Sequence, residues 1–147
     1  MAEASPSILE SWLLREEPRH FVLGHILRRS TEFGWVSDDE LADKGIGTWE
    51  CDLLQQNKLT WSGAVYDIFG FSQGSDVSRD QAVASYCTPS REILERIRSY
   101  AIDHSRAFIL DAEINAAAGM QRWMRIVAEP VVSDQGVVGL RGLKLPL

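Results

Sequence analysis

The chain has 147 residues, of which 45% are hydrophobic and 24% charged, and this composition is typical of one globular domain. Its formal net charge is -6, which argues against binding to nucleic-acid phosphates or to an anionic membrane surface. No apolar run approaches the ~20 residues that span a bilayer, and the first residues lack the pattern of a signal peptide. The two cysteines, Cys51 and Cys87, lack metal-site spacing. We therefore expect a cytoplasmic protein with reduced thiols.

Residues 1–44 are predicted to form a helical cap that is separate from a domain at 45–147. The cap holds nine acidic residues against five basic ones. Its residues follow helical spacing in two segments. The first has an apolar face of Ile8, Leu9, Trp12 and Leu13, and the second, after Pro18, has Phe21, Val22, His25, Ile26 and Arg29 on one side. Ser37 and Glu40 have the spacing of a capping box for a further turn, which Gly45 can end.

The periodicity changes from helical to alternating after Gly45. Residues 46–53 are predicted to form a strand with Trp49, Cys51 and Leu53 on one face. The polar residues 55–57 predict a turn into a second strand through Leu59 and Trp61, so that the two strands form a hairpin.

Three helical segments are predicted next. Residues 62–69 have helical spacing and end at Gly70, and residues 80–86 can form a further turn or two after a polar loop. Thr88 and Pro89 favour the N-cap and first residue of a longer helix. The apolar face of that helix is predicted to carry Ile93, Leu94, Ile97, Tyr100 and Ala101.

The remaining residues are predicted to form three strands, with turns at 118–119 and 133–136. Phe108, Leu110, Ala112 and Ile114 alternate with polar residues, and strands are also expected at 123–131 and 137–145. Consecutive strands favour antiparallel pairing. The fold class is therefore α+β, with one five-stranded antiparallel sheet, short helices on one face and the N-terminal helical cap.

Several segments of residues 45–145 together resemble the PAS family of sensor domains, in the subgroup with a G-x-W, W-S and Y-x-I-F-G opening. The opening corresponds to residues 45–53, 59–62 and 66–71. Residues 86–92 resemble the entry to the family's long helix, residues 120–123 resemble its R-W strand, and residues 134–142 resemble its final hairpin.

The sequence departs from the family pattern at two places. Members often carry a His-Pro-x-Asp segment at the helix entry, where this chain has Cys87 and Ser90 in place of the His and the Asp. Members that precede another enzyme usually end the last strand with Asp-Ile/Val-Thr, where this chain has residues 144–147 as Lys-Leu-Pro-Leu.

No residue pattern points to catalysis, so we expect no enzyme activity. The cysteines and Ser62 lack the motif context of a nucleophile. His104 is best explained by the dipole at a helix C-terminus, and Glu50 and Asp52 by an exposed sheet face, although paired carboxylates can serve acid–base chemistry. No metal-ligand cluster is visible. Compared with the family's haem and flavin-photoadduct domains, the chain lacks the axial histidine and the Asn-Cys-Arg-Phe-Leu-Gln motif, so neither cofactor is predicted.

The best candidate ligand site is a set of aromatic residues that the resemblance places between the sheet and its short helices. Trp and Tyr combine a large apolar surface with a polar group, which suits a small aromatic or amphipathic ligand. The alternative is that these residues only fill the core. The set comprises Trp49, Trp61, Tyr66, Phe69, Phe71 and Tyr86.

The cap is the other candidate, because the second face of the sheet needs a cover. The residues that can supply it include Trp12, Leu13, Phe21, Val22 and Ile26. Between two chains this cover would make a homodimer, as the resemblance implies, and within one chain it would only be packing.

The resemblance implies a non-enzymatic sensory or regulatory module of bacterial-type signal transduction. Such a module would bind a small ligand or a signalling partner and would respond by rearranging its cap helices or its dimer. Two alternatives remain open: a protein-interaction and dimerisation domain with a filled core, and a small α+β enzyme.

Overall fold

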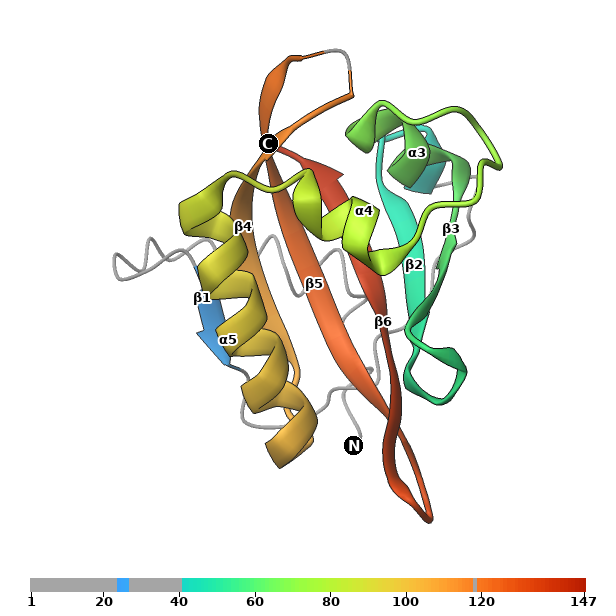
Figure 1. Ribbon diagram of the computed structural model, residues 1–147, viewed down its shortest axis with the longest axis vertical. Helices are drawn as coiled ribbons and strands as arrows, with labels where there is room; N and C mark the ends of the chain where they lie inside the picture. The colour runs from blue at the N-terminus through green and yellow to red at the C-terminus, as the bar shows by residue number, and fades with distance from the viewer. Residues whose placement is uncertain (1–23, 27–40, 118) are drawn as a thin grey trace, which may run out of the picture.

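One antiparallel sheet with helices on one of its faces makes up the computed structural model, which describes residues 24–26, 41–117 and 119–147 (Figure 1). The strands are β1 (Gly24–Ile26), β2 (Gly47–Asp52), β3 (Lys58–Trp61), β4 (Phe108–Asn115), β5 (Gln121–Ser133) and β6 (Gly136–Pro146). The helices are the 3₁₀ turn η1 (Leu53–Gln55), α3 (Gly63–Phe69), α4 (Arg79–Ala84) and α5 (Thr88–His104). None of these helices has the length and apolar character that crossing a bilayer requires.

The strands lie in the order β1-β4-β5-β6-β2-β3, and every neighbouring pair is antiparallel. The predicted α+β fold with five antiparallel strands, β2 to β6, is therefore confirmed. β1 adds a sixth strand beside β4, so the helical prediction is wrong at residues 24–26. Without β1, the backbone groups along this edge of β4 would lack a strand partner. Cap residues 1–23 and 27–40, with Trp12, Leu13, Phe21 and Val22 among them, lie outside the described residues.

The hairpin of β2 and β3 forms as predicted and places two tryptophans side by side. Trp49 pairs with Trp61 across the two strands. The turn begins with η1, where the Asp52 side chain accepts a hydrogen bond from the Leu54 amide. Asn57 closes the turn with a left-handed backbone, which asparagine tolerates better than most residues.

Helix α3 begins after Ser62 and ends at Gly70, as the sequence predicts. Gly70 has a φ of +77°, and its N–H donates to the carbonyl of Tyr66. Arg122 of β5 donates to the carbonyls of Asp67 and Ile68. The arginine of the R-W pattern thus caps the end of α3.

The long helix α5 ends at His104 as expected, and it differs from the prediction at its N-cap and at one position of its apolar face. Its N-cap is Cys87 rather than Thr88, although Pro89 lies in the first turn as expected. Tyr100 is exposed and stacks on His104 at 4.1 Å, so it does not belong to the buried face. The buried positions of the helix include Ser90, whose hydroxyl accepts a hydrogen bond from the Glu113 amide of β4.

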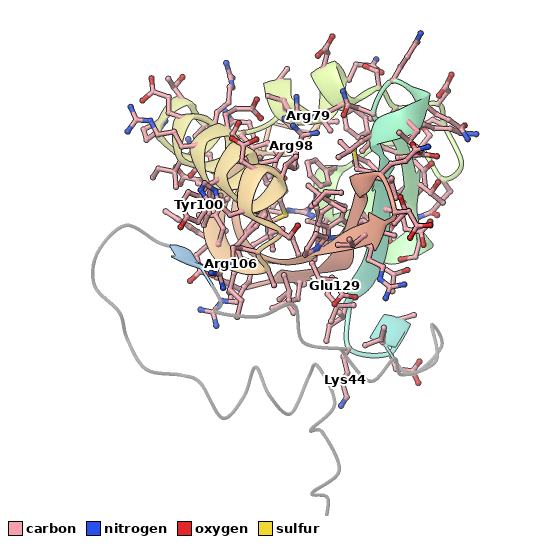
Figure 2. The ribbon with its side chains drawn as sticks, turned by 90° about the horizontal axis from the view of Figure 1, so that it is seen from below. Lys44, Arg79, Arg98, Tyr100, Arg106 and Glu129 are labelled. Atoms are coloured by element: carbon pink, nitrogen blue, oxygen red, sulfur yellow. The ribbon has the colours of Figure 1, made fainter. Side chains whose placement is uncertain are left out.

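The two faces of the sheet are both largely buried. The helix-side face packs against α3, α4 and α5, and the figures show these helices on one side of the sheet (Figures 1 and 2). Glu129 and Lys44 lie on the opposite side in Figure 2. A second apolar cluster on that side comprises Leu41, Ile46, Val127, Leu143 and Leu145.

Candidate functional site

The six aromatic residues that the sequence singles out do lie together between the sheet and the helices, and we call them the aromatic cluster. Trp61 is at its centre. The Trp61 ring stacks on Phe69 at 4.7 Å, and it meets the edge of Tyr66 at 5.3 Å and Phe71 at 6.2 Å. Residues from β3 and from α3 and the segment after it therefore form one continuous aromatic surface.

Tyr86 and Trp49 complete the aromatic cluster from other parts of the chain. Tyr86 precedes α5, forms an isolated bridge with Ile114 of β4 and meets Phe69 edge-on at 5.9 Å. Trp49 comes from β2, and its indole N–H donates to the Leu143 carbonyl over 3.2 Å. Tyr86 is only 2% exposed, so its hydroxyl is inside the protein.

A lysine that the sequence analysis did not select lies within the aromatic cluster. Lys144 of β6 is 7% exposed, and its amino group donates to the Tyr86 hydroxyl over 3.1 Å. The same amino group is 4.8 Å from the centre of the Phe69 ring and between 5.2 and 5.8 Å from the ring centres of Trp49, Trp61 and Tyr86.

The alternation along β6 relates Lys144 to Leu140, although only the packing of the sheet shows that this face is buried at the lysine. Leu140, Gly142 and Lys144 alternate along β6 and therefore share one face, and Leu140 belongs to the helix-side core. Across the strands, Lys144 lies beside Ile126 of β5 and Gly47 of β2. A Cβ atom on Gly47 would lie 2.4 Å from Cγ2 of Val65, so α3 packs directly against this position of β2.

The environment of Lys144 disfavours its charged form. Burial lowers the pKa of Lys144 to about 7 from the ordinary 10.5, and the positive charge of Arg79 acts in the same direction. None of the described carboxylates forms an ion pair with it. The surrounding aromatic faces offset part of the desolvation of the ammonium group.

A second buried donor lies in the same cluster. The indole N–H of Trp61 is inaccessible to solvent and has no hydrogen-bond acceptor among the described residues. Burial raises the pKa of Tyr86, so its phenol keeps its proton near neutral pH. Lys144, Trp61 and Tyr86 thus add three donor groups to those of Trp49 and Tyr66, which already donate to backbone carbonyls.

The other candidate residues have structural explanations. Asp52 caps η1, Glu50 is exposed on β2, and His104 lies in the last turn of α5 with Nδ1 3.0 Å from the Tyr100 carbonyl oxygen. Burial and a hydrogen bond with Glu113 raise the pKa of Cys87, which disfavours a reactive thiolate. Within residues 24–26, 41–117 and 119–147, no three His, Cys, Asp or Glu side chains are grouped as metal ligands.

Comparison with known proteins finds solved structures of similar fold. No family model matches the chain. No curated protein matches it either.

Three solved structures illustrate the structural likeness. The N-terminal domain of a diguanylate cyclase with PAS/PAC sensor from Marinobacter aquaeolei has a TM-score of 0.62 and 17% identity, and the match covers 69% of this chain and 94% of that one. A domain of a putative light and redox sensing histidine kinase from Haloarcula marismortui has a TM-score of 0.61 and 22% identity, covering 74% and 96%. A sensory box histidine kinase/response regulator from Burkholderia thailandensis has a TM-score of 0.62 and 12% identity, covering 73% and 80%.

The matched domains and this chain share the central antiparallel sheet with short helices on one face. At these identities the likeness concerns the fold and not the ligand. The chain therefore has the fold of a PAS domain.

Proposed function

We propose that this protein is a non-enzymatic sensory or regulatory module that binds a small molecule at the aromatic cluster. The observation that carries the proposal is the Trp61 indole N–H, which is buried among aromatic rings and has no acceptor in the part of the chain that the structure describes. A buried donor that lacks a partner costs free energy. A ligand that supplies an acceptor would remove this cost, and the aromatic rings would bury its apolar part.

The elements around the aromatic cluster suit transmission of a signal. Trp61 is on β3, Phe69 on α3, Tyr86 before α5 and Lys144 on β6, so a bound molecule would contact several elements at once. A ligand that prefers one arrangement of these elements would shift the population towards it. We propose that the cap or a homodimer interface passes this shift to a signalling partner or effector domain in the cytoplasm.

The similar domains support the regulatory part of the proposal. Those described as parts of histidine kinases and of a diguanylate cyclase belong to signalling proteins. For this chain, the same kind of output stays a proposal that depends on finding a ligand or partner.

The test is to search for a ligand of the purified full chain. An absorption spectrum and native mass spectrometry would detect a co-purified molecule, and a thermal-shift screen of small aromatic and amphipathic compounds would detect added ones. We expect bound compounds to raise Tm. Trp61→Phe should weaken the effect because it keeps an aromatic ring and removes the N–H. Trp123→Phe is the matched control, because Trp123 is 41% exposed and outside the aromatic cluster.

Two results would contradict the proposed function. A chain that carries no molecule and responds to none in the screen would contradict ligand sensing and would favour a protein-interaction domain with a filled core. Chemical turnover of a bound compound would contradict the non-enzymatic assignment.

A further inference from the structure

The position of Lys144 is unusual for a residue whose only role is to fill space. It is one of three lysines in the chain, and the other two, Lys44 and Lys58, are exposed. Lysine is rarely buried without a partner charge. Lys144 places its amino group on the core face of β6 beneath four aromatic rings, with a neutral phenol as its hydrogen-bond acceptor.

The polar groups of the aromatic cluster offer more hydrogen-bond donors than acceptors. The Tyr86 oxygen accepts a bond from Lys144, which leaves the phenol hydrogen free to donate. A lysine ammonium has three hydrogens, and Tyr86 uses one of them. Trp61 contributes an N–H that has no acceptor within residues 24–26, 41–117 and 119–147, and its ring centre is 5.8 Å from the Lys144 amino group.

A molecule that complements this arrangement must bring acceptors and one negative charge. A carboxylate has two acceptor oxygens and bears one charge, so it can satisfy several donors and pair with one ammonium. The surrounding rings favour an apolar, preferably flat, body for the rest of the molecule. A doubly charged group such as a phosphate monoester would leave one charge without a partner in a buried site.

We propose that the aromatic cluster binds small monocarboxylic acids with an apolar body, and that Lys144 and the Trp61 indole hold the carboxylate. This inference rests on the proposed function, because it names the ligand class of the same site. Tyr86 is a third donor to the carboxylate or supports Lys144 through the existing hydrogen bond.

The first test compares acids with their uncharged amides. Binding to the full chain would be measured by titration calorimetry for phenylacetate, indole-3-acetate and octanoate, each beside its primary amide. At least one acid should bind about tenfold or more tightly than its amide, since hydrogen bonds with charged groups are the stronger ones. Lys144→Met should abolish this preference, Trp61→Phe should reduce it, and Lys58→Met should leave it unchanged.

A second measurement uses the unmodified protein and so does not depend on the folding of a variant. Calorimetry in two buffers of different ionisation enthalpy, above the pH at which Lys144 titrates, gives the number of protons taken up on binding. Binding of an acid should be accompanied by the uptake of up to about one proton from the buffer, because the negative charge of the acid favours the ammonium form of Lys144. Binding of the corresponding amide should be accompanied by no proton uptake. The other ionisable groups near Lys144 are Tyr86, Cys51 and Arg79.

The outcomes separate this inference from the proposed function. If amides bind as well as acids, or if Lys144→Met keeps the preference, the carboxylate assignment is wrong and ligand sensing stands. If no acid binds while other compounds in the thermal-shift screen do, the ligand class is again wrong. If nothing binds at all, both proposals fail.

Discussion

The most informative single residue is Lys144, because its surroundings oppose its charge. Its pKa of about 7 in the folded protein lies below the 10.5 of an ordinary lysine. Between these two values the unfolded chain binds more protons than the folded one, so the free energy of unfolding rises with pH. Below pH 7 the lysine is protonated in both states, and the fold bears the full cost of burying the ammonium group.

Replacing this lysine should therefore stabilise the protein most at low pH. We expect Lys144→Met to raise the free energy of unfolding by about 1–4 kcal/mol below pH 7, because a flexible apolar side chain replaces a buried charge. The difference from the wild type should shrink as pH rises from 7 towards 10.5. Urea denaturation across this range measures it, with exposed Lys58→Met as the control. An equal difference at every pH would contradict the depressed pKa.

Ser90 gives a second prediction for a single residue. Its buried hydroxyl accepts the hydrogen bond from the Glu113 amide and so ties α5 to β4. Ser90→Ala leaves a backbone N–H without that acceptor and should cost about 1–3 kcal/mol of unfolding free energy. Chemical denaturation would measure the loss. Ser72→Ala, at an exposed position, should change stability little, and equal effects of the two changes would refute the assigned role.

Among the elements, β6 has the greatest effect on the site because it serves both faces of the sheet. Leu140 and Lys144 project into the core beneath the helices, whereas Leu143 and Leu145 belong to the cluster on the opposite side. β6 also lies between β5 and β2, so its register determines which residues meet Trp49. A shift of one residue would exchange the two faces and remove the lysine from the cluster.

The close approach of β5 and β6 at Gly142 tests this packing. A Cβ atom on Gly142 would lie 1.7 Å from the backbone carbonyl oxygen of Val127, so the two strands would have to separate. Gly142→Ala should therefore cost about 3 kcal/mol or more, measured by thermal or chemical denaturation. Gly63→Ala is the control, because its new methyl group would first meet the flexible end of Gln73. Similar losses at both glycines would argue against the tight strand contact.

At the scale of the whole molecule, the two faces of the sheet have different roles. The helix-side face encloses the aromatic cluster, where a ligand is proposed to bind. The opposite face has its own apolar cluster and a cross-strand ion pair, in which Arg141 donates to Glu129 over 2.7 Å. A signal that starts in the aromatic cluster would have to cross the sheet to reach a partner on this side.

The proposed homodimer makes a prediction at this scale. If the apolar residues of the cap join two chains, sedimentation equilibrium of the full chain should give twice the monomer mass. Trp12→Ser combined with Phe21→Ser should shift the mass towards the monomer, because each change removes apolar surface from the interface. Met120→Ser, at an exposed position near the β4–β5 turn, should not. A monomeric wild-type chain would mean that the cap only packs within one molecule.

Local sequence patterns determined most of the fold. The alternation in residues 46–61 and 108–114 marked β2, β3 and β4 and their buried faces, and glycine marked the end of α3. These features were predictable because side-chain periodicity and turn preferences act over a few neighbouring residues. The aromatic cluster was also predictable, because the resemblance to the PAS family places these residues between the sheet and its short helices.

Long-range packing determined the remaining features. Only the pairing of β6 with β2 and β5 places Lys144 among rings from four other segments. Only the completed core leaves the Trp61 N–H without an acceptor among the described residues. The extended backbone at residues 24–26 likewise depends on β4, more than 80 residues away along the chain. From the local sequence, a lysine in a strand is predicted to be exposed. It is buried here because both faces of its strand are covered. Its burial and its lowered pKa are consequences of tertiary contacts that no local pattern contains.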